Sequence, residues 1–202
     1  MAVAVISGTH GACAERLVVP AESVVRTPVG LTDVPTATLP MNGLTARMAL
    51  DLLELPDRVI VDAAPKDGRL VKDLGADVVL PRGTEYPELI RREVPDGVDG
   101  LVDTAGIAEL ASSAVRDNGR IAWSVHRVAV SADRGIVTRT TFVPRYAREH
   151  AKLDRLRRLA EEGRLTPRVA QTLPAEQAAE AHRLPAAGGL RGRVVLTFRQ
   201  AG

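Results

Sequence analysis

Three polar or flexible residues that could surround a ligand follow one of the β-like runs of this sequence. Asp103, Thr104 and Gly106 come directly after an apolar run that predicts a strand over residues 98–102. Ligands of open α/β sheets gather at the carboxyl ends of parallel strands, so this turn is a candidate binding site. The alternative is a plain turn in which Gly106 supplies backbone freedom.

Metal and nucleophile chemistry has little support in the residue spacing. The four histidines, His10, His126, His150 and His182, are scattered, and Cys13 is the single cysteine. No carboxylate stands at ligand spacing from them, so no zinc site is expected. We expect Cys13 to be a buried packing residue and His182 to serve packing or surface roles. No Ser-His-Asp arrangement can be argued, and the catalytic residues stay unknown.

The elements that must position the candidate turn alternate from residue 58 onward. Apolar runs predict strands at 58–61, 77–80, 98–102 and 120–124, separated by helical patterns at 67–74, 86–93 and 107–115. Such alternation is typical of a parallel sheet covered by helices on both faces.

The flanking regions predict different elements. Residues 1–30 predict short strands, including 16–19 and 24–25, and a strong helical pattern follows around Leu44, Met48 and Leu52. After residue 131 the sequence predicts an extended edge segment at 135–143, helices at 145–162 and 174–183, and short strands at 168–169 and 193–198.

Composition excludes several classes of function. Of 202 residues, 45% are hydrophobic and 26% charged, as in an ordinary soluble protein. Aromatic residues make up 2%, which argues against a stacking surface for single-stranded nucleic acid, and 27 basic residues nearly balance 25 acidic ones. One cysteine fits a reducing compartment, and no apolar run is long enough to cross a bilayer. We expect a cytoplasmic protein that binds neither nucleic acid nor membrane.

Several segments resemble the medium-chain dehydrogenase/reductase superfamily, in that family's order. GACAERLVVPAESVVRTPVGL is followed by ATLPMNGLTARMALDLL, which is similar to the family's entry into a long helix. LVKDLGADVVLPRG and GVDGLVDTAG are similar to its second Rossmann helix with the third strand, and to its fourth strand. GRLTPRVAQTLPAEQAAEAHR and GGLRGRVVLTF are similar to its C-terminal end. The chain looks most like the zinc-independent, NADP-dependent, quinone oxidoreductase-like branch.

This resemblance implies an α/β fold with a shortened, Rossmann-like, mostly parallel sheet, helices on both faces and a remnant of a GroES-like β domain. It places that remnant at residues 1–30 and the Rossmann-like domain at 31–144. Residues 145–202 would supply the C-terminal helices and a final strand that returns to the remnant. Most of the family's N-terminal catalytic barrel is missing.

The resemblance also implies roles for individual residues. Asn42 and Thr45 match the segment that lines the nicotinamide end of the cofactor site; the alternative is a helix start, with Asn42 as cap and Gly43 as a tight entry. Lys66 stands where NADP-dependent relatives contact the 2′-phosphate, although Ala64 replaces a frequent hydroxyl residue. Asp62 could instead accept a ribose hydroxyl, which favours NAD. The alternative for Lys66 is a solvated helix start.

One part of the family pattern is missing inside the chain. The helix that ends near Pro56 leads directly to the run 58–61, which is similar to the family's second Rossmann strand. The first strand, the glycine-rich turn and the following helix are absent, and no G-x-G-x-x-G or A-x-G-x-x-G/A stands between them. That turn brings backbone close to the pyrophosphate, and the helix offers its N–H groups. Dinucleotide affinity should therefore fall severely.

Three hypotheses follow. The first is a shortened reductase that, by ancestry, transfers hydride from NADPH to a quinone or an activated C=C or C=O bond. The second is a non-redox descendant that binds a small apolar molecule or catalyses a cofactor-free cyclisation or isomerisation. The third is a decayed pseudoenzyme, which would fold poorly because the missing strand exposes sheet edges. Any folded version is expected to be a homo-oligomer, paired through the edge at 135–143.

Overall fold

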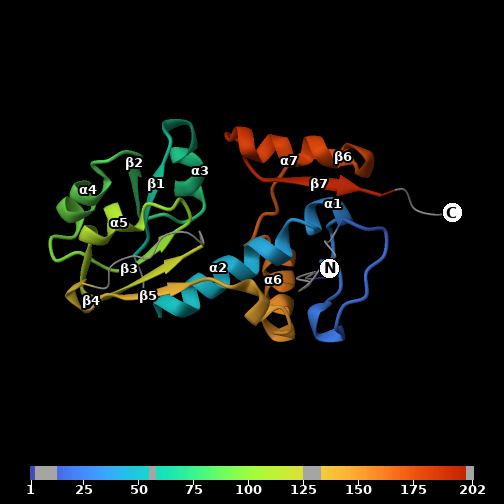
Figure 1. Cartoon of the computed structure of the whole chain (residues 1–202), viewed down its shortest axis with the longest axis horizontal. Coiled ribbons are helices and arrows are strands. Elements are labelled where there is room, and N and C mark those ends of the chain that lie inside the picture. The colour runs from blue at the N-terminus through green and yellow to red at the C-terminus, as the bar shows by residue number, and fades with distance from the viewer. Residues whose placement is uncertain (3–12, 55–57, 125–132, 199–202) are drawn as a thin grey trace. The chain divides into compact units, whose positions relative to one another are not determined.

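The chain forms two compact units. The computed structural model describes residues 1–2, 13–54, 58–124 and 133–198 (Figure 1). Unit 1 comprises residues 1–47 and 142–202, and unit 2 comprises residues 48–141. Helix α2 (Leu39–Leu53) begins in unit 1 and ends in unit 2. None of the described helices has the length and apolar character needed to span a bilayer.

Unit 1 has its core where α2 meets α6 (His150–Glu161). Leu153 and Leu156 lie three residues apart on one face of α6, and with Leu44 of α2 they belong to one buried cluster. The other elements of unit 1 are α1 (Asp33–Thr36), β6 (Val169–Pro174), α7 (Ala178–Ala187) and β7 (Arg193–Thr197), and β6 pairs with β7 in parallel.

Several predictions for unit 1 are wrong. Residues 16–19 form no strand, since they have no pairing partner among the described residues and Val18 is 98% exposed. Val24 forms only an isolated bridge with Ala2. Helix α6 begins five residues after the predicted start, because a 3-10 turn at Val143–Tyr146 precedes it. Pro174 ends β6 and opens no α-helix; a 3-10 turn (Ala175–Gln177) leads into α7.

Unit 2 contains the alternating strands and helices that the sequence predicts. They are β1 (Ile60–Ala63), α3 (Gly68–Asp73), β2 (Val78–Pro81), α4 (Tyr86–Glu93), β3 (Val98–Asp103), α5 (Ala108–Ala111), β4 (Val115–Trp123) and β5 (Val137–Thr140). Strand β4 begins five residues earlier than predicted. The predicted helix over 107–115 is shorter than expected, because a 3-10 turn (Ser112–Ala114) replaces its last residues.

The strands of unit 2 form two separate parallel sheets (Figure 1). One sheet contains β1 and β2, with Asp62 opposite Leu80. The other has the order β3-β4-β5, with Asp103 opposite Trp123. No ladder pairs β1 with β3 among the described residues, so each of these strands is an edge. The sheet is therefore interrupted between β1 and β3.

Apolar clusters on both faces hold the three-stranded sheet. Ile121 of β4 belongs to a buried cluster with Val115 and Ile136, whereas the neighbouring Ala122 contacts Ala49 and Leu53 at the end of α2. Successive residues of a strand point to opposite faces, so these clusters cover the two sides of the sheet. This confirms the predicted mixed α/β architecture with parallel strands and helices, and helix α2 covers the face that carries Ala122.

A third cluster joins the two sheets through one helix. Tyr86 and Ile90 of α4 are buried with Leu80 of β2, and Ile60 of β1 and Val98 of β3 pack against them. Helix α4 therefore contacts strands from both sheets, although the sheets share no backbone ladder. Burial raises the pKa of Tyr86 to about 12, and the charge of Asp62 adds to this shift.

Candidate functional site

The carboxyl ends of β1 and β2 lie side by side and carry an ion pair. The Nε of Arg82, which follows β2, donates to Oδ2 of Asp62 in β1 at 3.0 Å. The in-register pairing of β1 with β2 brings these residues together from 20 positions apart. Lys66 is exposed in the 3-10 turn (Pro65–Asp67) that leaves β1. Two cationic side chains therefore follow the ends of these strands.

The sequence analysis did not identify Arg82. The signal was present, because Arg82 directly follows an apolar run just as the candidate turn at Asp103 does. What the sequence could not show is that β1 and β2 are neighbours, which depends on long-range pairing. The Asp62 carboxylate accepts a charged hydrogen bond from Arg82, and its role as an acceptor for a ribose hydroxyl stays a prediction.

The turn after β3 is built by the carboxylate of Asp103. This side chain is 4% exposed, and its Oδ1 accepts hydrogen bonds from the backbone N–H groups of Ala105 and Gly106, both at 2.8 Å. Gly106 has a φ of 78°, which other residues adopt at a cost. Thr104 stands exposed at the tip. The carboxylate thus shapes the turn, and the exposed atoms of Thr104 and Ala105 are the ones available to a ligand.

The neighbouring ends of β4 and β5 add polar groups beside this turn. The N–H of Ser124 donates to the carbonyl of Asp103 at 2.9 Å, and the Oγ atoms of Thr141 and Ser124 are 2.9 Å apart. Nε1 of Trp123 is buried and has no hydrogen-bond partner among the described residues. The sequence patterns did not single out these residues, although Trp123 is the only tryptophan of the sequence and lies within a predicted strand.

Asn42 and Thr45 have partners within unit 1. Asn42 Oδ1 accepts from Nη1 of Arg193 at 2.8 Å, and Thr45 Oγ1 donates to the Met41 carbonyl at 2.7 Å. Asn42 is not a helix cap, because α2 begins three residues earlier. Gly43 is not an entry turn either: a Cβ there would lie 2.6 Å from Cδ1 of Leu156, so this glycine permits the close approach of α2 and α6.

The predicted residues therefore fall into three groups. Asp103, Thr104 and Gly106 share one turn, and Asp62 and Lys66 surround the end of β1; both groups belong to unit 2. Asn42 and Thr45 belong to α2 within unit 1. Their assignment to a cofactor stays a prediction.

A glycine-rich segment near the C-terminus does not replace the missing phosphate-binding turn. Residues 187–192 read A-G-G-L-R-G, which fits an A-x-G-x-x-G pattern. The segment connects the end of α7 to the start of β7, whereas a phosphate-binding turn leads from a strand into a helix. A Cβ on Gly192 would lie 2.6 Å from the Arg168 carbonyl oxygen, so this glycine serves the approach of β6 and β7.

The cysteine and the histidines give no metal site in the described part of the chain. Cys13 is exposed, so its predicted role as a buried packing residue is wrong. His182 is exposed on α7, and His10 and His126 lie outside the described residues. No group of three His, Cys, Asp or Glu side chains within the described ranges is arranged to hold a metal ion.

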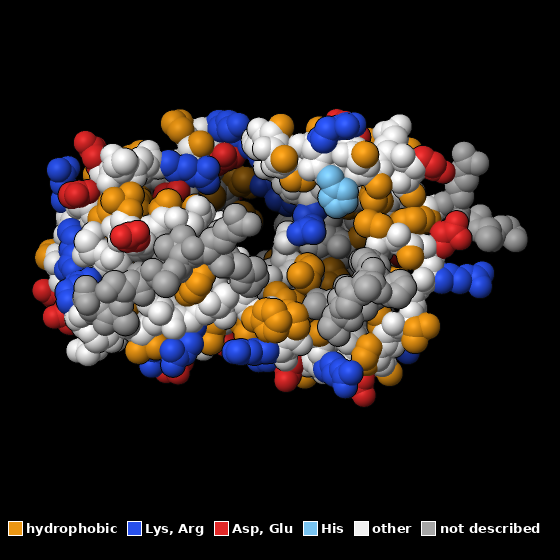
Figure 2. Space-filling model, in the orientation of Figure 1, with side chains coloured by type: hydrophobic (Ala, Val, Ile, Leu, Met, Phe, Trp, Pro, Cys, Tyr) orange, Lys and Arg blue, Asp and Glu red, His pale blue; other side chains and the backbone are white. Residues whose placement is uncertain are grey.

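Charged side chains are mixed over the face of the molecule shown in Figure 2. Lysines and arginines are interspersed there with aspartates and glutamates and form no single extended patch. This agrees with the nearly balanced composition of 27 basic and 25 acidic residues.

The family model for zinc-binding dehydrogenases matches residues 74–196, which is more than half of the chain. The chain belongs to the zinc-binding dehydrogenase family. The matched region begins at the end of α3 and reaches into β7. The family name implies zinc, but the described residues of this dehydrogenase-family chain do not provide a ligand set for it.

Solved structures place this dehydrogenase-family chain in the medium-chain dehydrogenase/reductase fold. An NAD-dependent alcohol dehydrogenase is 28% identical, with a TM-score of 0.77 over 96% of this chain and 66% of that chain. The apo form of the JamJ enoyl reductase is 22% identical, with a TM-score of 0.72 over 88% and 66%. The CurF ER cyclopropanase from the curacin A biosynthetic pathway is 22% identical, with a TM-score of 0.71 over 89% and 66%.

These comparisons confirm the predicted Rossmann-like α/β class and an oxidoreductase-like ancestry. The chain spans 66% of the length of each of these three structures, which is slightly less than two thirds. A search of curated proteins gave no match.

Proposed function

We propose that this chain is a shortened oxidoreductase of the zinc-independent, quinone oxidoreductase-like branch, and that its unit 2 binds NADPH weakly. When bound, NADPH would supply the hydride for reduction of a quinone or an activated C=C or C=O bond, with a proton taken from solvent. The observation that carries the proposal is the set of polar groups at the carboxyl ends of β1, β2 and β3, where open α/β sheets bind their ligands.

The residues present fit the adenosine end of the cofactor better than its centre. Lys66 and Arg82 provide two cations after adjacent strands, which suits a 2′-phosphate. Asp62 is paired with Arg82, which disfavours its use as an acceptor for an unphosphorylated ribose. These contacts support NADPH over NADH.

The centre of the cofactor has no cradle among the described residues. The sheet breaks between β1 and β3, and no glycine-rich strand-to-helix turn stands in the sequence between α2 and β1. Each hydrogen bond to a charged group contributes about 1.5–3 kcal/mol, so losing two of them weakens binding by roughly 10²–10⁴-fold. Starting from a micromolar affinity, we expect a Kd of about 0.1–10 mM.

Fluorescence titration of NADPH into the whole chain tests this function. We expect saturable binding in the stated range, weakened about tenfold by Lys66→Gln because a phosphate contact is removed. The matched control is Arg69→Gln, two residues into α3, whose side chain is 95% exposed. Absence of binding up to 10 mM, or equal effects of the two substitutions, would contradict the proposal.

The break in the sheet favours a second candidate, a non-redox protein that binds a small apolar molecule or catalyses a cofactor-free cyclisation or isomerisation. It predicts that a polycyclic or enone ligand raises the melting temperature in the absence of nucleotide. It also predicts no oxidation of NADPH, followed by its absorbance, when a quinone or enone is added. Saturable NADPH turnover would exclude this candidate.

A further inference from the structure

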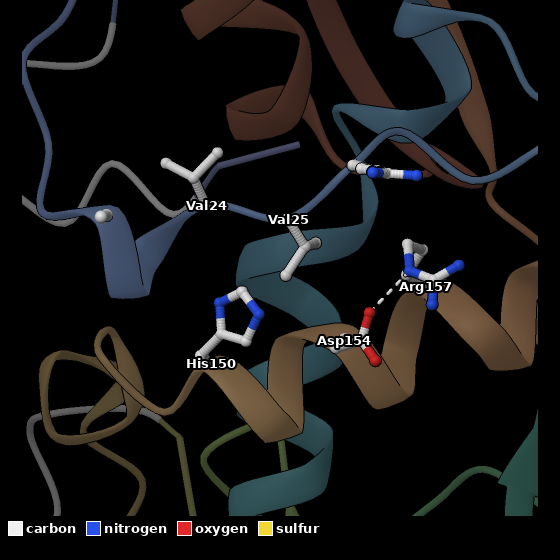
Figure 3. A pocket seen from close by; sticks show the side chains of 7 residues that line it. Val24, Val25, His150, Asp154 and Arg157 are labelled. Atoms are coloured by element: carbon white, nitrogen blue, oxygen red, sulfur yellow. Dashed lines mark hydrogen bonds and ion pairs between the residues drawn. The ribbon is translucent and has the colours of Figure 1, made fainter.

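A pocket in unit 1 is lined by none of the residues assigned to the cofactor. It has a volume of about 820 Å³, which is within the range of small-molecule sites. One wall is the segment that contains Val24, Val25 and Arg26, and the other is the face of α6 that carries His150, Asp154 and Arg157 (Figure 3). The α6 residues are spaced by four and three positions, so they share one side of the helix.

The walls of this pocket combine apolar and polar character. Val25 points from its segment toward α6, and His150 stands between the two walls (Figure 3). Val24 is 39% exposed, and Ala21 extends the apolar wall. A ligand with an apolar body can therefore cover surface that water now contacts, which is favourable.

The acidic side chain of the pocket is already neutralised. Asp154 accepts from Nε of Arg157 at 2.6 Å and pairs with Arg158 at 3.2 Å, and these interactions lower the pKa of Asp154. Arg157 also donates to Glu161 at 2.6 Å, and the other Glu161 oxygen accepts from the Val29 N–H at 2.8 Å. The contact of Glu161 with Val29 links α6 to the segment that follows Arg26. Asp154, Arg157 and Glu161 already use hydrogen-bonding groups in these interactions, so they have few left for a ligand.

Two polar side chains of the lining keep their donors available. Neither the Arg26 guanidinium nor the His150 imidazole forms a hydrogen bond to another described residue, and both residues are exposed. Apart from His150, the lining carries Arg26 and Arg157 against Asp154, a net charge of +1, and His150 also interacts with Asp154 through its charge. These groups are therefore solvent-accessible N–H donors beside an apolar wall, and their chemistry favours an anionic acceptor.

We propose that this pocket binds a small amphipathic carboxylate, with the carboxylate at Arg26, assisted by His150, and the apolar chain against Ala21 and Val24. Arg26 offers a planar fork of N–H donors that matches a carboxylate. The proposal is independent of the proposed function, because it uses none of the residues placed at the strand ends of unit 2.

Calorimetric titration of octanoate into the whole chain tests the site, with octanol as the uncharged probe of equal chain length. We expect saturable octanoate binding and at least tenfold weaker binding of octanol, since the alcohol cannot form the charged hydrogen bonds. Arg26→Gln should weaken octanoate about tenfold, and Arg155→Gln, at an exposed α6 residue outside the lining, should leave it unchanged.

Loss of folding is not expected to account for the weaker binding of the Arg26 variant. Arg26 makes no described hydrogen bond, so its variant should melt at the same temperature as the parent chain. A second variant, Val24→Ser, should weaken octanoate through the apolar wall alone. No octanoate binding up to 10 mM, equal binding of octanol, or equal effects of Arg26→Gln and Arg155→Gln would overturn the proposal.

Discussion

The two sheets of unit 2 are both parallel, yet they differ in how completely their strands are buried. In the three-stranded sheet, Val115, Ile121 and Ala122 of β4 are at most 1% exposed, because β4 has a neighbour on each side. In the two-stranded sheet, only Ala63 of β1 and Leu80 of β2 are buried. Both strands of that sheet are edges. The apolar residues of a strand are fully buried where that strand has a neighbour on each side.

This contrast explains where the ancestral chemistry is weakest. The polar turn after β3 belongs to the well-buried sheet, whereas Asp62, Lys66 and Arg82 follow the strands of the less buried one. A pyrophosphate cradle would have to stand between them, where the sheet is interrupted. The two groups of residues that we propose for the cofactor therefore lie on two sheets that no described ladder connects.

The largest expected effect is a difference in unfolding free energy between two isoleucine-to-alanine substitutions, one in each sheet. Ile121→Ala in β4 should cost about 2–5 kcal/mol of unfolding free energy, because it leaves a cavity in a fully buried cluster. Ile60→Ala in β1 should cost roughly 1–2 kcal/mol, since that side chain is only half-buried. Urea unfolding measures both values. Equal losses of unfolding free energy would contradict the difference in packing between the two sheets.

A second comparison uses two helical glycines, one in a tight helix contact and one with space around it. Gly43→Ala should destabilise by roughly 1–3 kcal/mol, because the new Cβ would lie 2.6 Å from Cδ1 of Leu156. Gly68→Ala in α3 should be neutral or stabilise by about 0.5–1 kcal/mol, because its Cβ would approach only Val79, at 3.9 Å. Thermal melts of the two variants test this. Similar melting temperatures would mean that the α2–α6 contact adjusts freely.

The smallest effect concerns acid stability. Hydrogen bonds from Arg157 lower the pKa of Asp154, and those from Val29 and Arg157 lower the pKa of Glu161. Their stabilisation is present above the ordinary values of 3.8 and 4.5 and disappears as the pH falls through the lowered folded-state pKa values.

Arg157→Gln should therefore lower the melting temperature at pH 7 and flatten its decline in acid. Its control is Arg82→Gln, which removes a more exposed ion pair with side chains 66% and 38% exposed and should change little. Melting curves between pH 7 and pH 2 give both results. An unchanged acid decline in the Arg157 variant would refute this role of the α6 network.

Sequence patterns predicted local elements better than pairings. The predicted helix over residues 86–93 coincides with α4, because its apolar residues recur at helical spacing and Pro87 fits the first turn. The contact of Asn42 with Arg193 spans 151 positions, and the Asp62–Arg82 pair depends on the register of two strands. Neither can be derived from local spacing. Residues 16–19 show the converse, since β-forming residues without a partner make no strand.

The junction between α2 and β1 predicted a missing strand, which would leave sheet edges exposed. Residues 55–57 of that junction lie outside the described residues, but β1 and β3 belong to different sheets. The gap that the sequence predicts is thus not closed by the pairing of these strands in the described part of the chain.

We propose that the protein recognises the adenosine end of NADPH and does not recognise its pyrophosphate. Competition calorimetry with NADPH and adenosine 2′,5′-bisphosphate tests this directly, because the two share the 2′-phosphate and only NADPH has the pyrophosphate. We predict dissociation constants within about threefold of each other. Binding of NADPH a hundredfold tighter than the bisphosphate would show that the protein does contact the pyrophosphate and would contradict this proposal.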